Sequence, residues 1–189
     1  MKELRTAILL FIGLTVICGG IYPLAVTGIA SIVFPYQAKG SLITGHDNHV
    51  IGSNLIGQPF SEEKYFWPRP SATAEFSYNP LASGGSNLGP TNTEFLSIVG
   101  MRVEALRDSG VKGDIPADLV EASASGLDPD ISPEAAYLQV ARIAKARKLD
   151  ELMLRRLIID HGQDRQWGIF GRPRVNVLRL NFALDDTQL

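Results

Sequence analysis

The longest pattern in the chain is an unbroken run of apolar and small residues near its N-terminus. Residues 6–34, TAILLFIGLTVICGGIYPLAVTGIASIVF, contain no charged residue and no histidine. A helix of roughly 20 apolar residues spans a bilayer core about 30 Å thick. The run therefore predicts one transmembrane helix over residues 7–30, after a short N-terminal stretch over 1–6. No second run of this kind follows.

Small and turn-forming residues interrupt the middle of this run. Gly19 and Gly20, with Tyr22 beside them, offer a surface that a second helix can approach closely, and Pro23 can kink the helix. These four residues predict packing against another membrane subunit. The alternative is a permissive helix that faces lipid throughout.

Two other interpretations of the apolar run fit its sequence less well. A cleaved signal peptide usually has an apolar region of about 7–15 residues, which is much shorter than this run. Lipid attachment at Cys18 requires a small residue before the cysteine, whereas Ile17 is bulky. An uncleaved anchor is favoured, in which Cys18 is a small apolar helix residue.

The charges that flank the helix predict its orientation. Lys2 and Arg5 precede it, and only Lys39 follows within the next dozen residues. The positive-inside rule then places the N-terminus in the cytoplasm and residues 31–189 outside it. The chain carries 18 Lys and Arg against 20 Asp and Glu. That balance argues against binding to nucleic acid or through a polybasic lipid-binding segment.

The polar part of the chain changes character near Pro90. Residues 40–90 are rich in Gly, Pro, Ser and Asn and predict turns and irregular loop, with short strand-like pieces. Helical periodicity then predicts three helices, capped at Thr91 or Thr93, at Ser132 ahead of Pro133, and near Asp150. The alternating stretch RVNVLRLNFAL, residues 174–184, predicts a strand. The fold class is therefore α+β, with about three helices and a small sheet in one extracytoplasmic domain.

Candidate catalytic motifs are weak. Ser61-Glu-Glu-Lys64 and Ser77-Tyr-Asn79 match two motifs of penicillin-interacting acyltransferases, but no Lys-Thr-Gly follows. His46 and His49 lack a third metal ligand, which favours a solvated loop, and no phosphate-binding Walker motif is present. We therefore expect no catalytic residue and no metal site. The alternative function is a membrane-anchored extracytoplasmic serine hydrolase that uses Ser61 or Ser71.

The segment YFWPRPSAT, residues 65–73, combines aromatic residues with an arginine between two prolines. The prolines hold the backbone extended, and aromatic residues and arginine are enriched at interface hot spots. The segment predicts a docking surface, and its alternative is an aromatic bend packed on its own domain. The docking candidates are Tyr65, Phe66, Trp67, Arg69, Pro70 and Ser71.

Several longer stretches together resemble the C subunits of the Kdp-type potassium-transporting P-type ATPases, nearly from end to end. The stretches are GGIYPL (19–24), GSNLIGQPF (52–60), YFWPRPSATAEFSYNPLASGGSNLGPTN (65–92), ASASGLDPDISPEAA (122–136), VARIAKAR (140–147) and GRPRVNVLRLNFALD (171–185).

The resemblance implies a non-catalytic subunit of the bacterial cytoplasmic (inner) membrane, with one membrane helix and one soluble domain. Its partners would be a channel-like potassium-binding subunit, a P-type ATP-hydrolysing subunit and a small helical subunit, besides membrane lipid. The complex imports potassium, and it, rather than this chain, handles ATP and potassium. The chain has no Asp-Lys-Thr-Gly phosphorylation motif. The implied role is assembly and stabilisation.

A further role implied by the resemblance is to raise the ATP affinity of the hydrolysing subunit. That role is linked to Ser83, Gly84, Gly85 and Gln139. It conflicts with the predicted topology, because ATP is cytoplasmic and these residues would lie outside. Any such effect would have to pass through the membrane helices as a coupling between distant sites.

Overall fold

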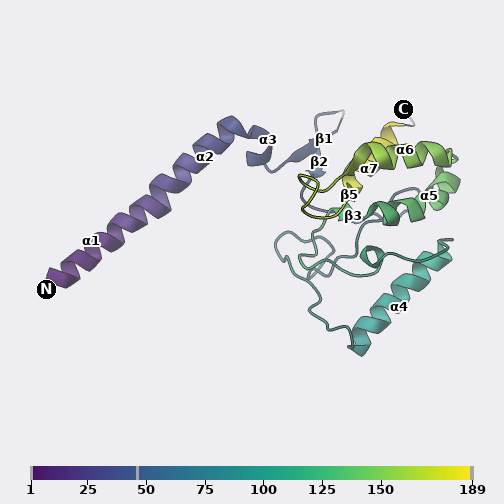
Figure 1. The fold of residues 1–189 in the computed structure, drawn as a ribbon, viewed down its shortest axis with the longest axis horizontal. Helices are drawn as coiled ribbons and strands as arrows, with labels where there is room; N and C mark the ends of the chain where they lie inside the picture. The colour runs from purple at the N-terminus through teal and green to yellow at the C-terminus, as the bar shows by residue number, and fades with distance from the viewer. Residues whose placement is uncertain (1, 46, 188–189) are drawn as a thin grey trace. The chain divides into compact units, whose positions relative to one another are not determined.

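The chain folds into two compact units, Met1–Ile51 and Gly52–Leu189. The structure is a computed structural model, and it describes residues 2–45 and 47–187. Figure 1 gives the order of the elements.

The first unit is dominated by a single long helix. It consists of α1 (Lys2–Val16), the π-helical turn η1 (Ile17–Ile21) and α2 (Tyr22–Val33). These segments form one helix of 32 residues that is long and apolar enough to cross a membrane, and its most apolar window has no buried side chain. The helix expected over residues 7–30 is thus present and extends beyond both of those ends.

The π-helical turn has a local cause in the sequence. A proline has no N–H group, so Pro23 cannot donate to the carbonyl four residues earlier, at Gly19. The helix widens at this point, and the N–H of Tyr22 donates to the carbonyl of Ile17, five residues before it. Turns of this kind inside α-helices are frequent at functional positions. The expected irregularity at Pro23 is therefore a local widening that contains both central glycines.

The unit continues after the long helix with short elements. A single turn of helix, α3 (Pro35–Ala38), precedes β1 (Leu42–Thr44) and β2 (Val50–Ser53), which pair in a two-stranded sheet. No regular helix or strand longer than these occurs between β2 and the helix that begins at Thr93. The expectation of turns and irregular loop over residues 40–90 is confirmed.

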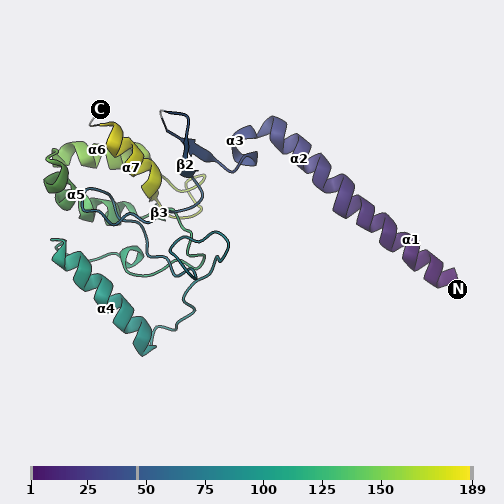
Figure 2. The same cartoon turned by 180° about the vertical axis from the view of Figure 1, so that it is seen from behind.

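The second unit packs helices around a small antiparallel sheet. Its strands β3 (Asp130–Ile131), β4 (Gly162–Gln163) and β5 (Arg174–Asn176) have the order β3-β5-β4. The helices α5 (Pro133–Arg147), α6 (Glu151–His161) and α7 (Val177–Asp186) all contact β5. Figures 1 and 2 show these three helices gathered over the sheet, with α4 (Thr93–Asp108) along another edge. A short 3₁₀ turn, η2, covers Ala117–Leu119.

The core lies between these helices and the sheet. Its fully buried side chains come from β3, α5, α6, β5 and α7, and one comes from the loop at residue 66. The largest of them are Phe66, Ile131, Ile143, Leu154, Ile158, Leu180 and Leu184. The α+β fold class expected from the sequence is confirmed.

The three predicted helices are present, with one change at a cap. The hydroxyl of Ser132 accepts from the N–H of Ala135 at 3.1 Å, and the carboxylate of Asp150 accepts from Leu152 N–H at 3.1 Å. The first helix is capped by Asn92, whose side-chain oxygen accepts from Glu94 N–H at 2.8 Å. The expectation of Thr91 or Thr93 at that position was wrong by one residue, since Asn is an equally favourable cap.

The predicted strand over residues 174–184 is wrong beyond its third residue. Strand β5 ends at Asn176, whose side chain accepts from Arg179 N–H at 3.0 Å and so caps α7. The buried side chains of α7 are Val177, Leu178, Leu180, Asn181 and Leu184. Positions 177, 180, 181 and 184 repeat with the helical period, which the shorter alternation of apolar residues concealed. The second unit therefore has a fourth α-helix.

Candidate functional site

The segment around residue 66 is held to the helices by two buried side-chain amides. Asn181 accepts from the N–H of Phe66 at 2.8 Å and donates to its carbonyl at 2.9 Å. Gln139 accepts from the N–H of Trp67 at 2.7 Å and donates to its carbonyl at 3.2 Å. Both amides are almost fully buried. They satisfy the main chain of two successive residues, much as a neighbouring β-strand would.

Two arginines of α5 hold the preceding residues of the same segment. Arg142 donates to the carbonyls of Glu63 and Tyr65, the latter at 3.0 Å, and its guanidinium lies 4.0 Å from the centre of the Trp67 ring. Arg147 donates to the carbonyl of Lys64 at 2.8 Å and forms an ion pair with Asp185. The backbone of residues 63–67 is thereby fixed to α5 and α7 at successive positions.

Burial affects the charge of Arg142. The side chain is 7% exposed and is held mainly by carbonyl oxygens, so desolvation lowers the pKa of Arg142 to about 10. The guanidinium is still charged at neutral pH. Its Nε is buried without a hydrogen-bond partner in the part of the chain that the structure describes. Such a group carries a desolvation cost that the other donors of the same guanidinium offset.

Arg69 points away from this core and into a charged cleft. Its Nη1 lies 3.0 Å from the Asp128 carboxylate, and its Nε donates to the carbonyl of Glu121 at 3.2 Å. The hydroxyl of Tyr78 donates to the main-chain carbonyl of Arg69. Burial, together with the nearby Asp128 carboxylate, raises the pKa of the Tyr78 phenol. Hydrogen bonds thus hold both the main chain of Arg69 and its guanidinium group.

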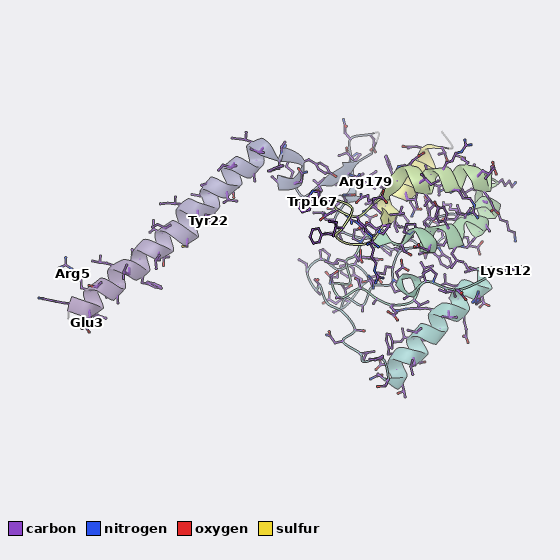
Figure 3. All side chains as sticks on the ribbon, in the orientation of Figure 1. Glu3, Arg5, Tyr22, Lys112, Trp167 and Arg179 are labelled. Carbon is purple, nitrogen blue, oxygen red and sulfur yellow. The ribbon has the colours of Figure 1, made fainter. Side chains whose placement is uncertain are left out.

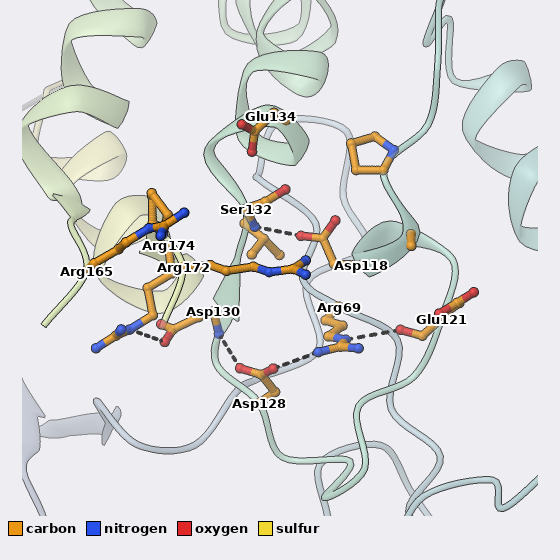
Figure 4. A pocket seen from close by; sticks show the side chains of 14 residues that line it. Arg69, Asp118, Glu121, Asp128, Asp130, Ser132, Glu134, Arg165, Arg172 and Arg174 are labelled. Carbon is orange, nitrogen blue, oxygen red and sulfur yellow. Dashed lines mark hydrogen bonds and ion pairs between the residues drawn. The ribbon is translucent and has the colours of Figure 1, made fainter. Parts of the chain in front are cut away.

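The charged cleft has a volume of about 870 Å³, and Figure 4 shows the side chains that line it. Its carboxylates and arginines are partly paired: Arg69 pairs with Asp128, and the Nε of Arg174 lies 3.0 Å from Asp130. Burial and the neighbouring Asp128 carboxylate raise the pKa of Asp130, and Arg174 opposes that shift. Among the described residues, the lining combines five carboxylates with four arginines, which suits contact with a charged partner surface. The charged residues are Arg69, Asp118, Glu121, Asp128, Asp130, Glu134, Arg165, Arg172 and Arg174.

Ser71 organises the loops beside this cleft. Its hydroxyl donates to the carbonyl of Gly126 at 2.8 Å and accepts from the N–H of Tyr78 at 2.9 Å. It also lies 3.0 Å from the Thr73 hydroxyl. These groups include no base that could activate a nucleophile. The serine-hydrolase alternative therefore finds no support in the structure at Ser71.

The segment 83–85 packs against the loop at 123–126. The hydroxyl of Ser83 and the N–H of Gly84 both donate to the carbonyl of Ser125, at 3.0 and 2.9 Å. A Cβ added at Gly85 would lie 3.1 Å from the carbonyl oxygen of Ala124. Glycine thus allows two loop backbones to approach closely here. Gln139, linked to the same role by resemblance, is buried at 0% exposure in the amide contact described above.

The structure separates the docking candidates into buried and accessible residues. Phe66 is part of the core, whereas Tyr65, Trp67, Arg69, Pro70 and Ser71 are all partly exposed. Four of the accessible residues, Trp67, Arg69, Pro70 and Ser71, line a shallow depression of about 320 Å³ beside the charged cleft. Its lining is completed by Pro59, Phe60, Ser61, Pro68, Ser77 and Tyr78.

The membrane-helix candidates lie in or next to the π-helical turn. A Cβ added at Gly19 or at Gly20 would meet no atom within 4 Å, and Tyr22 is exposed. Residues 2–45 and 47–187 contain no group of three or more His, Cys, Asp or Glu that could hold a metal ion. His46 of the predicted solvated loop lies outside the described residues.

Sequence comparison identifies the family. A sequence profile described as "KdpC: K+-transporting ATPase, c chain" matches residues 4–186. The chain belongs to this family. A "Potassium-transporting ATPase KdpC subunit" of Geobacter sulfurreducens is 64% identical over 185 residues, covering 98% of each chain. The KdpC subunit of Citrifermentans bemidjiense is 60% identical, covering 100% of this chain and 99% of the relative. The KdpC subunit of Dechloromonas aromatica is 56% identical over 96% of each chain.

Sequence reasoning missed the residues that position the YFWPRPSAT segment. Arg142, Arg147 and Asn181 were not identified, although each lies on a helix facing the core. The sequence contains a usable signal at Arg142 and Asn181. Each of these polar side chains falls on the same helical face as the buried apolar residues of its own helix. Buried polar groups at such positions are normally hydrogen-bonded.

Proposed function

We propose that the chain is a non-catalytic subunit of an ATP-driven potassium importer and that it supports assembly and stability of the complex. The observation that carries the proposal is the family match over nearly the whole chain, together with a long apolar helix whose side chains are not buried. The described loops and cleft offer contact surfaces and no catalytic arrangement. The channel-like, ATP-hydrolysing and small helical subunits are the partners.

The proposed topology has one membrane span in the bacterial cytoplasmic membrane. Residues 1–6 lie in the cytoplasm, residues 7–30 cross the bilayer, and residues 31–189 lie outside. The charge bias from Lys2 and Arg5 supports this orientation. The helix extends beyond the proposed span, from Lys2 to Val33, and a tilted helix accommodates this length.

The membrane helix binds a partner helix at its centre. Gly19 and Gly20 lack side chains that would hold a neighbour away, and the open space around both positions supports this surface. Tyr22 and Pro23 flank it, and because Pro23 has no N–H group to donate, we expect the widened turn to leave a backbone carbonyl for a partner side chain. The glycine pair therefore allows close contact between the two helices, and the π-helical turn offers a polar backbone group to the partner helix.

The extracytoplasmic domain binds its partner subunit through the accessible part of the YFWPRPSAT segment. Buried amides and arginines fix the backbone of this segment, so little conformational entropy is lost when a partner binds. The ring of Trp67 and the prolines supply apolar area, and Arg69 supplies charge at the edge of the cleft. Phe66 contributes indirectly, by anchoring the segment in the core.

In the proposed topology, this subunit acts on ATP affinity through the membrane helices. The buried position of Gln139 and the loop contacts of Ser83 favour structural roles for both. The proposed topology separates them from cytoplasmic ATP. Coupling between an outer domain and an ATP site must be reciprocal, so ATP analogues should change the affinity of this subunit for the complex by the same factor.

Growth at limiting potassium tests the proposal. In a strain that lacks the chromosomal copy, the wild-type gene should restore growth and the Gly20→Leu variant should not, because added bulk would block the partner helix. Ala25→Leu adds comparable bulk to an exposed position outside the glycine pair and serves as the matched control. Equal growth with Gly20→Leu and wild type, at equal protein levels, would contradict the proposed helix contact.

A further inference from the structure

The connection between β4 and β5 forms a tight hairpin. Gln166 and Phe170 form an isolated antiparallel bridge, with main-chain hydrogen bonds of 2.9 and 3.0 Å in the two directions. Three residues, 167–169, lie between the bridged pair, and the first two of them, Trp167 and Gly168, have positive φ, at 52° and 74°. The hairpin therefore has a defined shape and displays residues 167–170 at its end.

The end of this hairpin is strongly apolar and exposed. Trp167 is 89% exposed, Ile169 73% and Phe170 60%. The rings of Trp167 and Phe170 meet edge to face, with their centroids 6.0 Å apart. Figure 3 shows Trp167 at the margin of the domain. A tight turn that holds three large apolar side chains in solvent is unfavourable unless something covers them.

Positive charge borders the apolar end on both sides. Arg165 precedes it and Arg172 follows it, and both are exposed. Within the described ranges 2–45 and 47–187, neither guanidinium has a hydrogen-bond or ion-pair partner. The next arginine along the chain, Arg174, is paired with Asp130 instead. Both arginines also border the charged cleft, and Asp164 precedes Arg165, so residues 164–172 carry a net charge of +1 beside the aromatic side chains.

We propose that this hairpin end, Trp167, Ile169 and Phe170, inserts into the interface of a phospholipid bilayer, with Arg165 and Arg172 bound to anionic headgroups. Trp is enriched at membrane interfaces, where its ring meets both apolar chains and polar headgroups. Guanidinium groups bind phosphate in a bidentate manner. The inference rests on the proposed membrane anchoring of the chain, and it assigns a lipid ligand to a part of the domain outside the membrane helix.

The length of the chain supports contact with the bilayer. Residues 34–51 join the long helix to the second unit, and 18 residues can span at most about 60 Å even when fully extended. The helix therefore keeps the hairpin at a high effective concentration near lipid. A weak insertion by three side chains is enough under those conditions, whereas it would not hold a free domain on a membrane.

The chain contains a favourable set of reporters for testing this. It has two tryptophans, and neither lies in the long helix. Trp67 is packed against Arg142, whereas Trp167 stands at the hairpin end. The full-length protein would be reconstituted into phosphatidylcholine vesicles with and without phosphatidylglycerol. Lipids brominated near the headgroup would then quench any tryptophan that enters the interface.

Insertion predicts a specific pattern of quenching. Wild-type fluorescence should fall by roughly a third or more with the shallow brominated lipid, and Trp167→Phe should abolish most of that fall. Joint replacement of Ile169 and Phe170 by Ser should weaken the quenching while Trp167 remains as the reporter. Leu81→Ser, at another exposed apolar site, should leave it unchanged. Replacing Arg165 and Arg172 by Gln should remove the dependence on phosphatidylglycerol.

Two outcomes would overturn the lipid proposal. The first is equal quenching of the wild type and Trp167→Phe, which would mean that Trp167 stays in water. The second is protection of Trp167 from an aqueous quencher only after the partner subunits are added. That result would mean that the hairpin binds a partner protein instead of lipid. Retention of partner subunits during purification is measured separately, so failure of insertion is distinguishable from failure of the proposed subunit function.

Discussion

The buried amide of Gln139 makes a quantitative prediction about the segment that it holds. In Gln139→Leu the side chain keeps a similar size but loses its hydrogen bonds to the N–H and carbonyl of Trp67, and Arg142 loses one acceptor at 2.7 Å. An unsatisfied buried polar group costs about 1–3 kcal/mol. Two orphaned main-chain groups, partly offset by the apolar gain from leucine, give a loss of about 3 kcal/mol in the free energy of unfolding.

The corresponding assay is thermal unfolding of the full-length protein in detergent micelles, followed by near-ultraviolet circular dichroism. For a unit of this size, 1 kcal/mol corresponds to about 3 °C, so Tm should fall by about 10 °C. Lys145→Ala, an exposed change on the same helix, should shift Tm by less than about 2 °C. A Gln139→Leu variant that melts together with the wild type would refute the structural role of this amide.

The remaining predictions concern the loops beside the charged cleft. Gly126→Ala should destabilise the domain by about 2 kcal/mol or more, because φ is +68° and the new Cβ would lie 2.7 Å from the carbonyl oxygen of Gly84. Gly84→Ala is the control, with no atom nearer than 3.9 Å, and equal unfolding midpoints for the two in urea would contradict the packing argument. Asp128→Asn should lower the free energy of unfolding by no more than about 1 kcal/mol in the same assay, because the ion pair of Asp128 with Arg69 is about 30% exposed. A much larger loss would contradict the weak contribution expected of this ion pair. The pKa of Tyr78 is raised in the folded state, so its contribution to stability is complete below the unfolded value near pH 10 and is lost as the pH rises above it. Tyr78→Phe should therefore lose less stability than the wild type between pH 9.5 and 11 in urea titrations, and parallel losses would exclude this ionisation.

The sequence predicted the long helix and three of the four helices of the domain because their periodicity and caps are local. Ser132 followed by Pro133, and Asp150, define helix starts by chemistry that involves only neighbouring residues. The fourth helix was missed because apolar residues at 175, 177, 178, 180 and 182 also fit a strand. The change from strand to helix occurs at Asn176, which ends β5 and caps α7. The end of the strand depends on the tertiary pairing of β5 with β3 and β4.

The residue types of the site could be predicted from the sequence, but their arrangement in space largely could not. The aromatic and arginine content of residues 65–71 was evident, but the division between buried Phe66 and cleft-lining Arg69 depends on partners more than 50 residues away. No local pattern links Phe66 to Asn181 or Arg69 to Asp128. The hairpin with Trp167 was overlooked for a different reason, since exposure of an apolar residue cannot be read from its identity.

One purification tests most directly whether this chain acts as a subunit. The full-length protein would be isolated by affinity in mild detergent from its native membrane after growth at limiting potassium. The account predicts that a large multi-span protein and an ATPase subunit elute with it and that the eluate shows potassium-stimulated ATP hydrolysis. Recovery of the chain alone, stable and monodisperse, from membranes that contain those subunits would contradict the account.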